Sequence, residues 1–314
     1  MSPINLSRRS VGPIPPSTTV TRPVLVGTVT LDFLHEGPLG RGHDPATVRW
    51  GGVANNAACA LGARGARPAL LTVEYSGELG PAVAGHLAAN AVDWLPLPAR
   101  APLPVFHAEL VDGSVAGKRF FGERALGLIT PDLLGRSHGS LDGAGAVAAG
   151  TDTEAPALAW LADTARERGM PFWLLSADPN EVSKLRPEGR RADLVALNQR
   201  ELSLWAGRSL DDWDDVIAAA RRLPAPGGRC LVTLGERGSL LVRADGADVV
   251  HQPPVPLADA VITVGAGDVL FGCLLAGRLA GLGWEAALKE ATELTSLFLA
   301  TPDDVPDPYR ALRT

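Results

Sequence analysis

Short apolar runs and longer amphipathic stretches alternate along the chain. The apolar runs are rich in Val, Leu and Ala and are typical of buried strands; they cover residues 24–31, 69–73, 92–95, 105–111, 119–121, 146–149, 172–175, 193–197, 230–234 and 239–242. Between them, apolar residues recur at helical spacing, which predicts helices over 53–65, 78–91, 154–168, 201–205, 211–223, 266–280 and 285–300. This alternation predicts an α/β fold with a mostly parallel sheet covered by helices on both faces.

Two segments in the first half interrupt this rhythm. Residues 35–50 are irregular and contain Gly and Pro, while 104–121 holds two strand-like runs around the turn Asp112-Gly113. We expect these segments to form a small β lid beside the main domain. Residues 1–22 are rich in Pro, Ser and Thr and are predicted to be a disordered arm, which leaves 23–314 as one domain.

The composition excludes several classes of protein. The 314 residues include 35 Gly and 26 Pro, too few for a collagen-like or low-complexity chain. A net charge of −6 argues against nucleic-acid partners, which need stripes of Lys and Arg. The chain has no uncharged apolar stretch of roughly 18 residues, so no membrane span is predicted.

Cysteine usage and the N-terminal segment predict a cytoplasmic protein. The three cysteines, Cys59, Cys230 and Cys273, are far apart, and no Cys-x-x-Cys pair occurs. Neither a disulfide framework nor a zinc site is therefore indicated. Arg8 and Arg9 are not followed by the apolar core of a signal peptide.

The sharpest local motif is Thr263-Val264-Gly265-Ala266-Gly267-Asp268, directly before an apolar helix. Glycines allow a tight turn, and the unpaired N–H groups of a helix's first turn favour an anion. Asp268 lies on that same turn, where it would repel a phosphate that is merely bound. It suits a site in which the acid accepts a proton from an attacking hydroxyl while the N–H groups hold the developing charge. The structural alternative is an Asp that stabilises its own helix.

Three further motifs each have a functional and a structural interpretation. Gly51-Gly52-Val53-Ala54-Asn55-Asn56 precedes a helix, where Asn56 would either contact a polyol or cap the helix. Asn198-Gln199-Arg200-Glu201 follows a strand, where ligands bind in open α/β sheets, or it caps a helix. Val232-Thr233-Leu234-Gly235-Glu236-Arg237-Gly238 is a strand with a Gly-rich turn, and the alternative there is a tight hairpin.

Together these motifs resemble the PfkB/ribokinase family of sugar and nucleoside kinases. Gly51-Gly52-x-x-x-Asn56 is similar to its N-terminal signature, and Gly265-Ala266-Gly267-Asp268 with Phe271 and Leu275 is similar to its C-terminal signature. Asp178-Pro179-Asn180 and the other two motifs fall in the family's order, so the resemblance covers about residues 24–300. It implies a ribokinase-like three-layer α/β/α sandwich and an ATP-dependent kinase that acts on a hydroxyl group.

The resemblance also implies the chemistry at the site. Asp268 would be the general base, and the backbone N–H groups of Gly265, Ala266 and Gly267 would form the anion hole for the transferring phosphoryl group. No Walker A motif occurs, so ATP would be bound by other means.

The nucleotide, the metal and the acceptor would occupy the remaining motifs. Asn198 and Glu201 would place Mg²⁺ and phosphates, Glu201 acting through water. The residues expected to line the nucleotide site are Thr233, Gly235 and Gly238. Those expected to bind the acceptor, a sugar, polyol or nucleoside, are Asp32, Gly52 and Asn56. Asp32 is expected to follow the first strand, in Gly27-x-x-x-x-Asp32.

The chain departs from the family pattern at two places. Ile262-Thr263-Val264 stands where the family has Asp-Thr-Thr, and the lost oxygens normally help to build a monovalent-cation site, so we expect weak or absent K⁺ activation. Tyr75-Ser76-Gly77-Glu78-Leu79-Gly80 lacks the usual Gly-Asp, which leaves substrate contacts near Ser76 undefined.

Alternative functions follow from these departures. A catalytically weak or inactive member, acting as a sugar- or nucleotide-binding regulator, is the main one; the retained Asp268 argues against it, since a binder needs no base. A nicotinamide-dependent oxidoreductase is excluded because no Gly-x-Gly-x-x-Gly follows the first strand. The lid is compatible with a homodimer, because dimerisation through the lid is common in the family. The acceptor, the hydroxyl that is phosphorylated and the donor preference are not set by the sequence.

Overall fold

The computed structural model describes residues 22–37, 46–122, 124–246, 248–257, 262–302, 305 and 307–313. The predicted arm, residues 1–22, lies outside the described residues except for Arg22, which begins the first strand.

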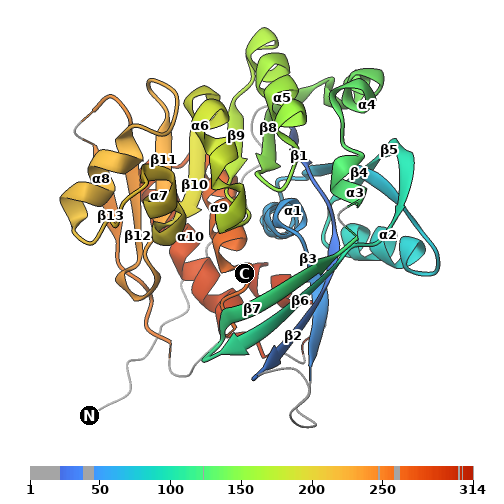
Figure 1. Cartoon of the computed structure of the whole chain (residues 1–314), viewed down its shortest axis with the longest axis horizontal. Helices are drawn as coiled ribbons and strands as arrows, with labels where there is room; N and C mark the ends of the chain where they lie inside the picture. The colour runs from blue at the N-terminus through green and yellow to red at the C-terminus, as the bar shows by residue number, and fades with distance from the viewer. Residues whose placement is uncertain are drawn as a thin grey trace.

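A nine-stranded sheet forms the centre of the molecule (Figure 1). Its order is β13-β12-β11-β10-β9-β8-β1-β4-β5. The strands, in chain order, are β1 (Arg22–Val26), β4 (Ala69–Ser76), β5 (Asp93–Pro102), β8 (Ala144–Gly150), β9 (Phe172–Leu175), β10 (Leu194–Asn198), β11 (Arg229–Thr233), β12 (Ser239–Arg243) and β13 (Val249–Gln252). The pairings from β5 to β11 are parallel, and β12 and β13 join antiparallel at one edge.

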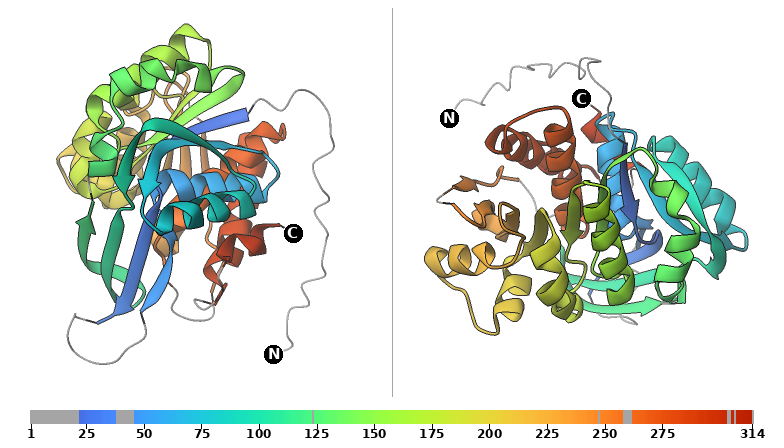
Figure 2. Two further views of the ribbon diagram at one scale, coloured as in Figure 1. Left: turned by 90° about the vertical axis from the view of Figure 1, so that its right-hand side faces the viewer. Right: turned by 90° about the horizontal axis from the view of Figure 1, so that it is seen from above.

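Helices cover both faces of this sheet, as the view from above in Figure 2 shows. One layer contains α1 (Val53–Ala63), α2 (Leu79–Ala89), α9 (Ala266–Leu279) and α10 (Trp284–Leu299). The other contains α4 (Pro131–Arg136), α5 (Ala155–Glu167), α6 (Leu185–Glu188), α7 (Gln199–Ala206) and α8 (Trp213–Arg221). Two helical layers around one sheet give the expected α/β/α sandwich. Short helical segments complete the chain: α3 (Arg124–Gly127) and the 3₁₀ turns η1 (His138–Leu141), η2 (Pro179–Lys184), η3 (Gly189–Arg191), η4 (Gly235–Arg237) and η5 (Pro308–Leu312).

Small residues allow the helices α1 and α9 to pack closely against each other. The interior of α1 is nearly all Ala, Asn and Gly and is buried. Gly272 of α9 lies against it, and a Cβ at Gly272 would come 2.6 Å from the Ala57 carbonyl oxygen. The absence of a side chain at this position therefore sets the separation of α1 and α9.

A second, four-stranded sheet stands apart from the large one (Figures 1 and 2). Its order is β3-β2-β6-β7, formed by β3 (Thr47–Gly51), β2 (Thr30–Glu36), β6 (Val105–Val111) and β7 (Ser114–Phe121). Strands β2 and β6 are parallel, and the two outer pairs are antiparallel. We call this element the second sheet. The irregular segment predicted over 35–50 supplies its β3, while 38–45 lies outside the described residues.

The strand predicted over 24–31 is wrong as one strand, because the chain changes sheets within it. Strand β1 ends at Val26, and β2 begins at Thr30 in the second sheet. Between them, the Val29 N–H donates to the side-chain hydroxyl of Tyr75 at 2.7 Å and not to a backbone carbonyl of a neighbouring strand. Asp32, expected to follow the first strand of the large sheet, consequently lies on the second sheet.

Candidate active site

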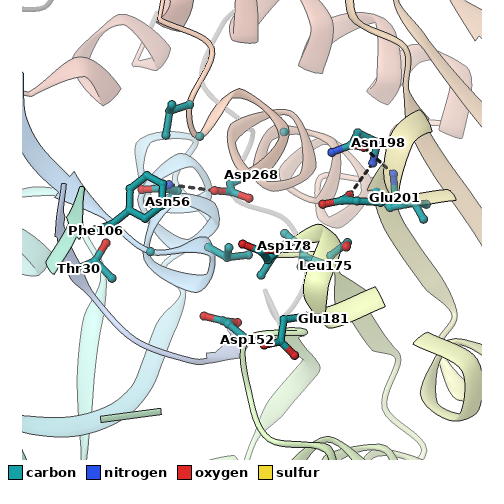
Figure 3. A pocket seen from close by; sticks show the side chains of 18 of the residues that line it. Thr30, Asn56, Phe106, Asp152, Leu175, Asp178, Glu181, Asn198, Glu201 and Asp268 are labelled. Carbon is teal, nitrogen blue, oxygen red and sulfur yellow. Dashed lines mark hydrogen bonds between the residues drawn. The ribbon is translucent and has the colours of Figure 1, made fainter. Parts of the chain in front are cut away.

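A pocket of about 620 Å³ lies where the large sheet, the start of α9 and the second sheet meet (Figure 3). Most of the residues singled out from the sequence line it, although they are distant along the chain. They are Asp32, Gly52, Asn56, Asn198, Glu201, Thr233, Gly265, Gly267 and Asp268. The fold therefore gathers the four separate motifs around one cavity.

Three residues singled out from the sequence are not among those lining the pocket. The Ala266 N–H, expected in the anion hole, donates to the Thr263 carbonyl at 3.1 Å. Gly235 and Gly238 form the turn between β11 and β12, where the Gly238 N–H donates to the Gly235 carbonyl at 2.9 Å. Gly238 has φ 83°, and a Cβ there would come 2.1 Å from the Gln252 carbonyl oxygen, so the turn itself requires glycine. The hairpin interpretation accounts for both glycines.

Asp268 lies on the first turn of α9 and points into the pocket (Figure 3). The Asn56 side chain, on α1, donates from Nδ2 to Asp268 Oδ2 at 2.9 Å. Burial raises the pKa of Asp268 to about 7; the Asn56 hydrogen bond opposes this, and the nearby Asp152, Glu201 and Asp32 add to it. A carboxylate with such a pKa can accept a proton near neutral pH.

The start of α9 offers hydrogen-bond donors beside this carboxylate. Gly265 precedes the helix with φ 82°, in the left-handed region that favours glycine. The first helical bond runs from the Val269 N–H to the Gly265 carbonyl at 3.0 Å. The Gly267 and Asp268 N–H groups precede that bond and have no partner within the helix, which makes this turn suited to an anion.

The residues expected to bind the acceptor lie at α1 and on the second sheet. Asp32 accepts from Thr30 Oγ1 at 2.6 Å, and burial raises its pKa to about 6, opposed by Thr30 and by Arg49. Gly52 precedes α1 with φ 99°, and a Cβ there would come 2.4 Å from the Thr28 carbonyl oxygen. Phe106 of β6 adds an apolar surface to the pocket.

Asp152 lines the pocket and was not predicted from the sequence. It comes two residues after β8, so its position at the carboxyl end of a buried strand was the available signal. Burial raises its pKa to about 6, partly opposed by Lys184. Within the described chain, Asp152 Oδ1 and Thr28 Oγ1 are buried without a hydrogen-bond partner, and both residues line the pocket. Orphaned buried polar atoms in a pocket wall indicate a place where a polar ligand binds.

Asn198 and Glu201 form a reciprocal cap at the start of α7 (Figure 3). The Asn198 N–H donates to Glu201 Oε2 and the Glu201 N–H donates to Asn198 Oδ1, both at 2.9 Å. The capping interpretation is thus realised, yet both residues also line the pocket. Burial raises the pKa of Glu201, and Asp178 adds to that effect.

The carboxylates of Glu201 and Asp178 both line the pocket and provide oxygen atoms that can act as metal ligands. Mg²⁺ prefers oxygen ligands and keeps several waters, so this pair suits a hydrated magnesium ion that also contacts phosphate. Within the described ranges, no group of three or more His, Cys, Asp or Glu residues is arranged to hold a metal.

Lys118 connects the second sheet to the large domain across the pocket. It projects from β7 and forms an ion pair with Asp178, just before η2. Both residues line the pocket, so the second sheet borders the cavity directly.

The segment before α9 rests on the second sheet. The Thr263 N–H donates to the Gly113 carbonyl, in the β6–β7 turn, at 3.1 Å, and Arg49 Nη2 donates to the Val264 carbonyl at 2.6 Å. Ile262 and Val264, the two residues that differ from the family's Asp-Thr-Thr, pack against a small apolar cluster of Leu34, Ala108 and Leu110. Their side chains therefore anchor the turn to the second sheet.

Comparisons with known proteins place this pocket in context. Residues 141–305 match the pfkB family of carbohydrate kinases. Among curated proteins, 1-phosphofructokinase from Escherichia coli (strain K12) is 42% identical over 105 residues, which is 33% of each chain. Deoxyribokinase from Salmonella typhi is 36% identical over 102 residues, 32% of each. These matches cover about a third of the length of the curated relatives.

Solved structures share the fold over nearly the whole chain. Adenosine kinase from Sinorhizobium meliloti has a TM-score of 0.80 at 18% identity, covering 94% of this chain and 98% of that one. Ribokinase from Arabidopsis thaliana, solved with ribose and ATP, has a TM-score of 0.69 at 19% identity, with the same coverage. The expected ribokinase-like α/β fold is confirmed. In the part of the chain that the structure describes, no helix combines the length and apolarity needed to cross a bilayer.

Proposed function

Since the chain belongs to the pfkB family of carbohydrate kinases, we propose that it transfers a phosphoryl group from ATP to a hydroxyl of a sugar, polyol or nucleoside. The observation that carries this proposal is the position of Asp268. Its carboxylate points into the pocket on the same helical turn that presents free N–H groups. A base and an anion-binding turn at one point are what phosphoryl transfer to a hydroxyl requires.

In the proposed reaction, the acceptor oxygen attacks the terminal phosphorus of ATP as Asp268 takes the hydroxyl proton. The new O–P bond forms, the bond to ADP breaks, and the N–H groups of Gly265 and Gly267 hold the charge of the transferring group. Ala266 shapes this turn through its bond to Thr263 and would join the anion hole only if that bond opened.

The nucleotide side would be formed by Asn198, Glu201 and Thr233, with Gly235 and Gly238 shaping the adjoining turn. Mg²⁺, when bound, would neutralise phosphate charge. Glu201, through water, and Asp178 are the residues that would hold it. Their shared position in the pocket wall supports this assignment.

The acceptor side would be formed by Asp32, Gly52 and Asn56. We add Asp152, because it lines the pocket and its buried Oδ1 has no hydrogen-bond partner within the described chain. Two buried carboxyl groups suit hydroxyl groups, which donate hydrogen bonds to them.

The decisive experiment follows ATP consumption over a panel of sugars, polyols and nucleosides. We expect Asp268→Asn to lower kcat by at least ~10²-fold, the low end for loss of a general base. Asp132→Asn, which changes an exposed aspartate whose side chain is 71% accessible, serves as the matched control and should keep full activity. Equal turnover by wild type and Asp268→Asn would refute the assignment of the base.

We also propose weak or absent K⁺ activation. Ile262 and Val264 provide no side-chain oxygen, and both pack into an apolar cluster. The rate measured against K⁺ at constant ionic strength should stay flat, and strong specific activation would contradict the proposal.

A sugar- or nucleotide-binding regulator is the second candidate, favoured by those same two positions. It would bind ligand in calorimetry without producing ADP from any acceptor. The placement of Asp268 beside the start of α9 argues for the kinase.

A further inference from the structure

Tyr309 connects the C-terminal segment to the proposed base. Its hydroxyl, on η5, donates to Asn56 Oδ1 at 2.8 Å, and Asn56 Nδ2 donates to Asp268 Oδ2 at 2.9 Å. Tyr309 is only 3% exposed. Burial holds its pKa well above 10, so the hydroxyl keeps its proton and remains a donor throughout the working pH range. None of the sequence motifs includes this residue.

The orientation of the Asn56 amide determines whether its nitrogen or its oxygen faces the Asp268 carboxylate. An amide has one accepting oxygen and one donating nitrogen, and rotation by half a turn exchanges them. In this structure the oxygen accepts from Tyr309 and, more weakly, from Asn55 Nδ2 at 3.4 Å. The nitrogen then faces Asp268, where it favours the ionised carboxylate. The opposite orientation would place the amide oxygen against the carboxylate and raise the pKa of Asp268.

The segment that carries Tyr309 is held firmly against α1 and α10. Tyr309 packs on Phe298 of α10 with ring centroids 5.6 Å apart. Arg64, directly after α1, donates to the Leu312 carbonyl at 2.9 Å and pairs with Glu290 of α10 at 2.7 Å. Arg313 donates to the Ala89 carbonyl at 3.0 Å. These contacts fix the hydroxyl in place, which a positioning role requires.

We propose that Tyr309 is a positioning residue for the base: its hydroxyl fixes the Asn56 amide so that the nitrogen faces Asp268. The inference rests on the proposed role of Asp268. Through Asn56, Tyr309 keeps Asp268 Oδ2 occupied, which leaves the other oxygen to receive the proton of the acceptor.

The charged and titratable groups around this chain of contacts come from several elements. Asp268 interacts electrostatically with Asp152 after β8, Glu201 of α7 and Asp32 of β2. Tyr309 interacts in the same way with Cys59 of α1, Arg49 of β3, Asp268 and Asp32. Because most of these groups are acidic, a donor from Asn56 is the main contact that favours the ionised base.

The first test compares pH profiles of kcat/KM for wild type and Tyr309→Phe, which keeps the ring and its packing. Loss of the hydroxyl should lower kcat/KM about tenfold at neutral pH, the size expected for one buried hydrogen bond. The acid limb of the profile, the range in which kcat/KM falls as the pH is lowered, should move to higher pH. Tyr75→Phe is the matched control, since it removes a buried hydroxyl bonded to Val29 and Thr72; its acid limb should not move. An unchanged profile for Tyr309→Phe would overturn the proposal.

The second test is a double-mutant cycle with Asn56→Ala. If Tyr309 acts through Asn56, Tyr309→Phe should change kcat/KM by less than about twofold when Asn56 is already absent. Equal effects in both backgrounds would show a merely structural role and reject the proposal. Thermal unfolding of each variant identifies any that fails to fold.

A third measurement tests the positioning role of Tyr309 independently of the proposed kinase activity. Carbon-13 NMR titration of the aspartate carboxyl groups, with Asp268→Asn to assign the resonance, gives the pKa of Asp268 without substrate. We expect a higher value in Tyr309→Phe than in wild type, whether or not the chain proves to be a kinase. An identical value would refute the positioning role even in an active enzyme.

Discussion

Asp32, Asp152 and Asp268 line one pocket, and burial raises the pKa of each of them. Asp152 and Asp32 also act on Asp268, because a negative charge nearby disfavours a second one. The three carboxyl groups therefore titrate together in a range where free carboxyl groups are already ionised.

We expect kcat/KM to fall as the pH drops below about 7, because Asp268 must be ionised to accept a proton and its pKa is about 7. Asp152→Asn removes one of the charges that raise this pKa. The midpoint of the acid limb should then move to lower pH by about half a unit or more. Initial rates from pH 5 to 9 check this.

Asp142→Asn is the control for that experiment, since its side chain is 72% accessible and pairs with Arg168 on the surface. Its profile should match wild type. An acid limb that stays in place in Asp152→Asn would contradict the coupling between Asp152 and Asp268.

The candidate site could be predicted from the sequence only where its chemistry is local. Asp268 and Gly265 share one short motif, and Asn198 and Glu201 share another. The sequence alone therefore indicates that the members of each pair lie close together. The bonds from Arg49 to Val264 and from Tyr309 to Asn56 span 215 and 253 positions. Nothing near Tyr309 or Arg49 in the sequence indicates these partners, which only folding brings together.

The elements of the large sheet were largely predictable, because parallel strands buried on both faces are short continuous apolar runs. The change from the large sheet to the second sheet between β1 and β2 could not be predicted. Residues 24–31 are mostly Val, Leu and Thr, and this pattern carries no information on which sheet each half joins. The edge strand β13 was missed because its four residues are only partly buried and include a histidine.

The second sheet and the turn before α9 form one connected unit through Arg49. Arg49→Met should lower kcat/KM by roughly 10- to 100-fold, because a charge-assisted hydrogen bond is lost at the turn that would bind the phosphoryl group. It should also weaken binding of the acceptor, since Arg49 opposes the raised pKa of Asp32. Steady-state kinetics over both substrates measure this.

Arg100→Met is the matched control, because Arg100 forms an exposed pair with Glu74 and neither residue lines the pocket. It should leave kcat/KM unchanged. A rate for Arg49→Met within twofold of wild type would show that the second sheet and the turn act independently.

At the scale of the whole molecule, one face of the second sheet exposes apolar side chains to solvent. Val48 of β3 and Phe121 of β7 are 51% and 54% exposed. They pair with Phe33 and Val105, on the face opposite to Asp32 and Phe106. We propose that a second copy of the chain covers this face, forming the homodimer with which the sequence is compatible.

Light scattering after gel filtration tests the dimer. Wild type should have twice the chain mass of 32.7 kDa. The double variant Val48→Asp, Phe121→Asp should have the mass of one chain, because buried carboxylates oppose association. Leu297→Asp changes an apolar side chain on α10 that is 44% exposed and should remain dimeric. A monomeric wild type would exclude the dimer.

The ion pair between Lys118 and Asp178 has a consequence for the timing of the catalytic cycle. It joins the second sheet to the large domain, and both of its residues line the pocket that would hold the two products. Any motion that parts the second sheet from the large domain breaks this contact. Such opening motions, and not the chemical step, set the turnover rate in many enzymes.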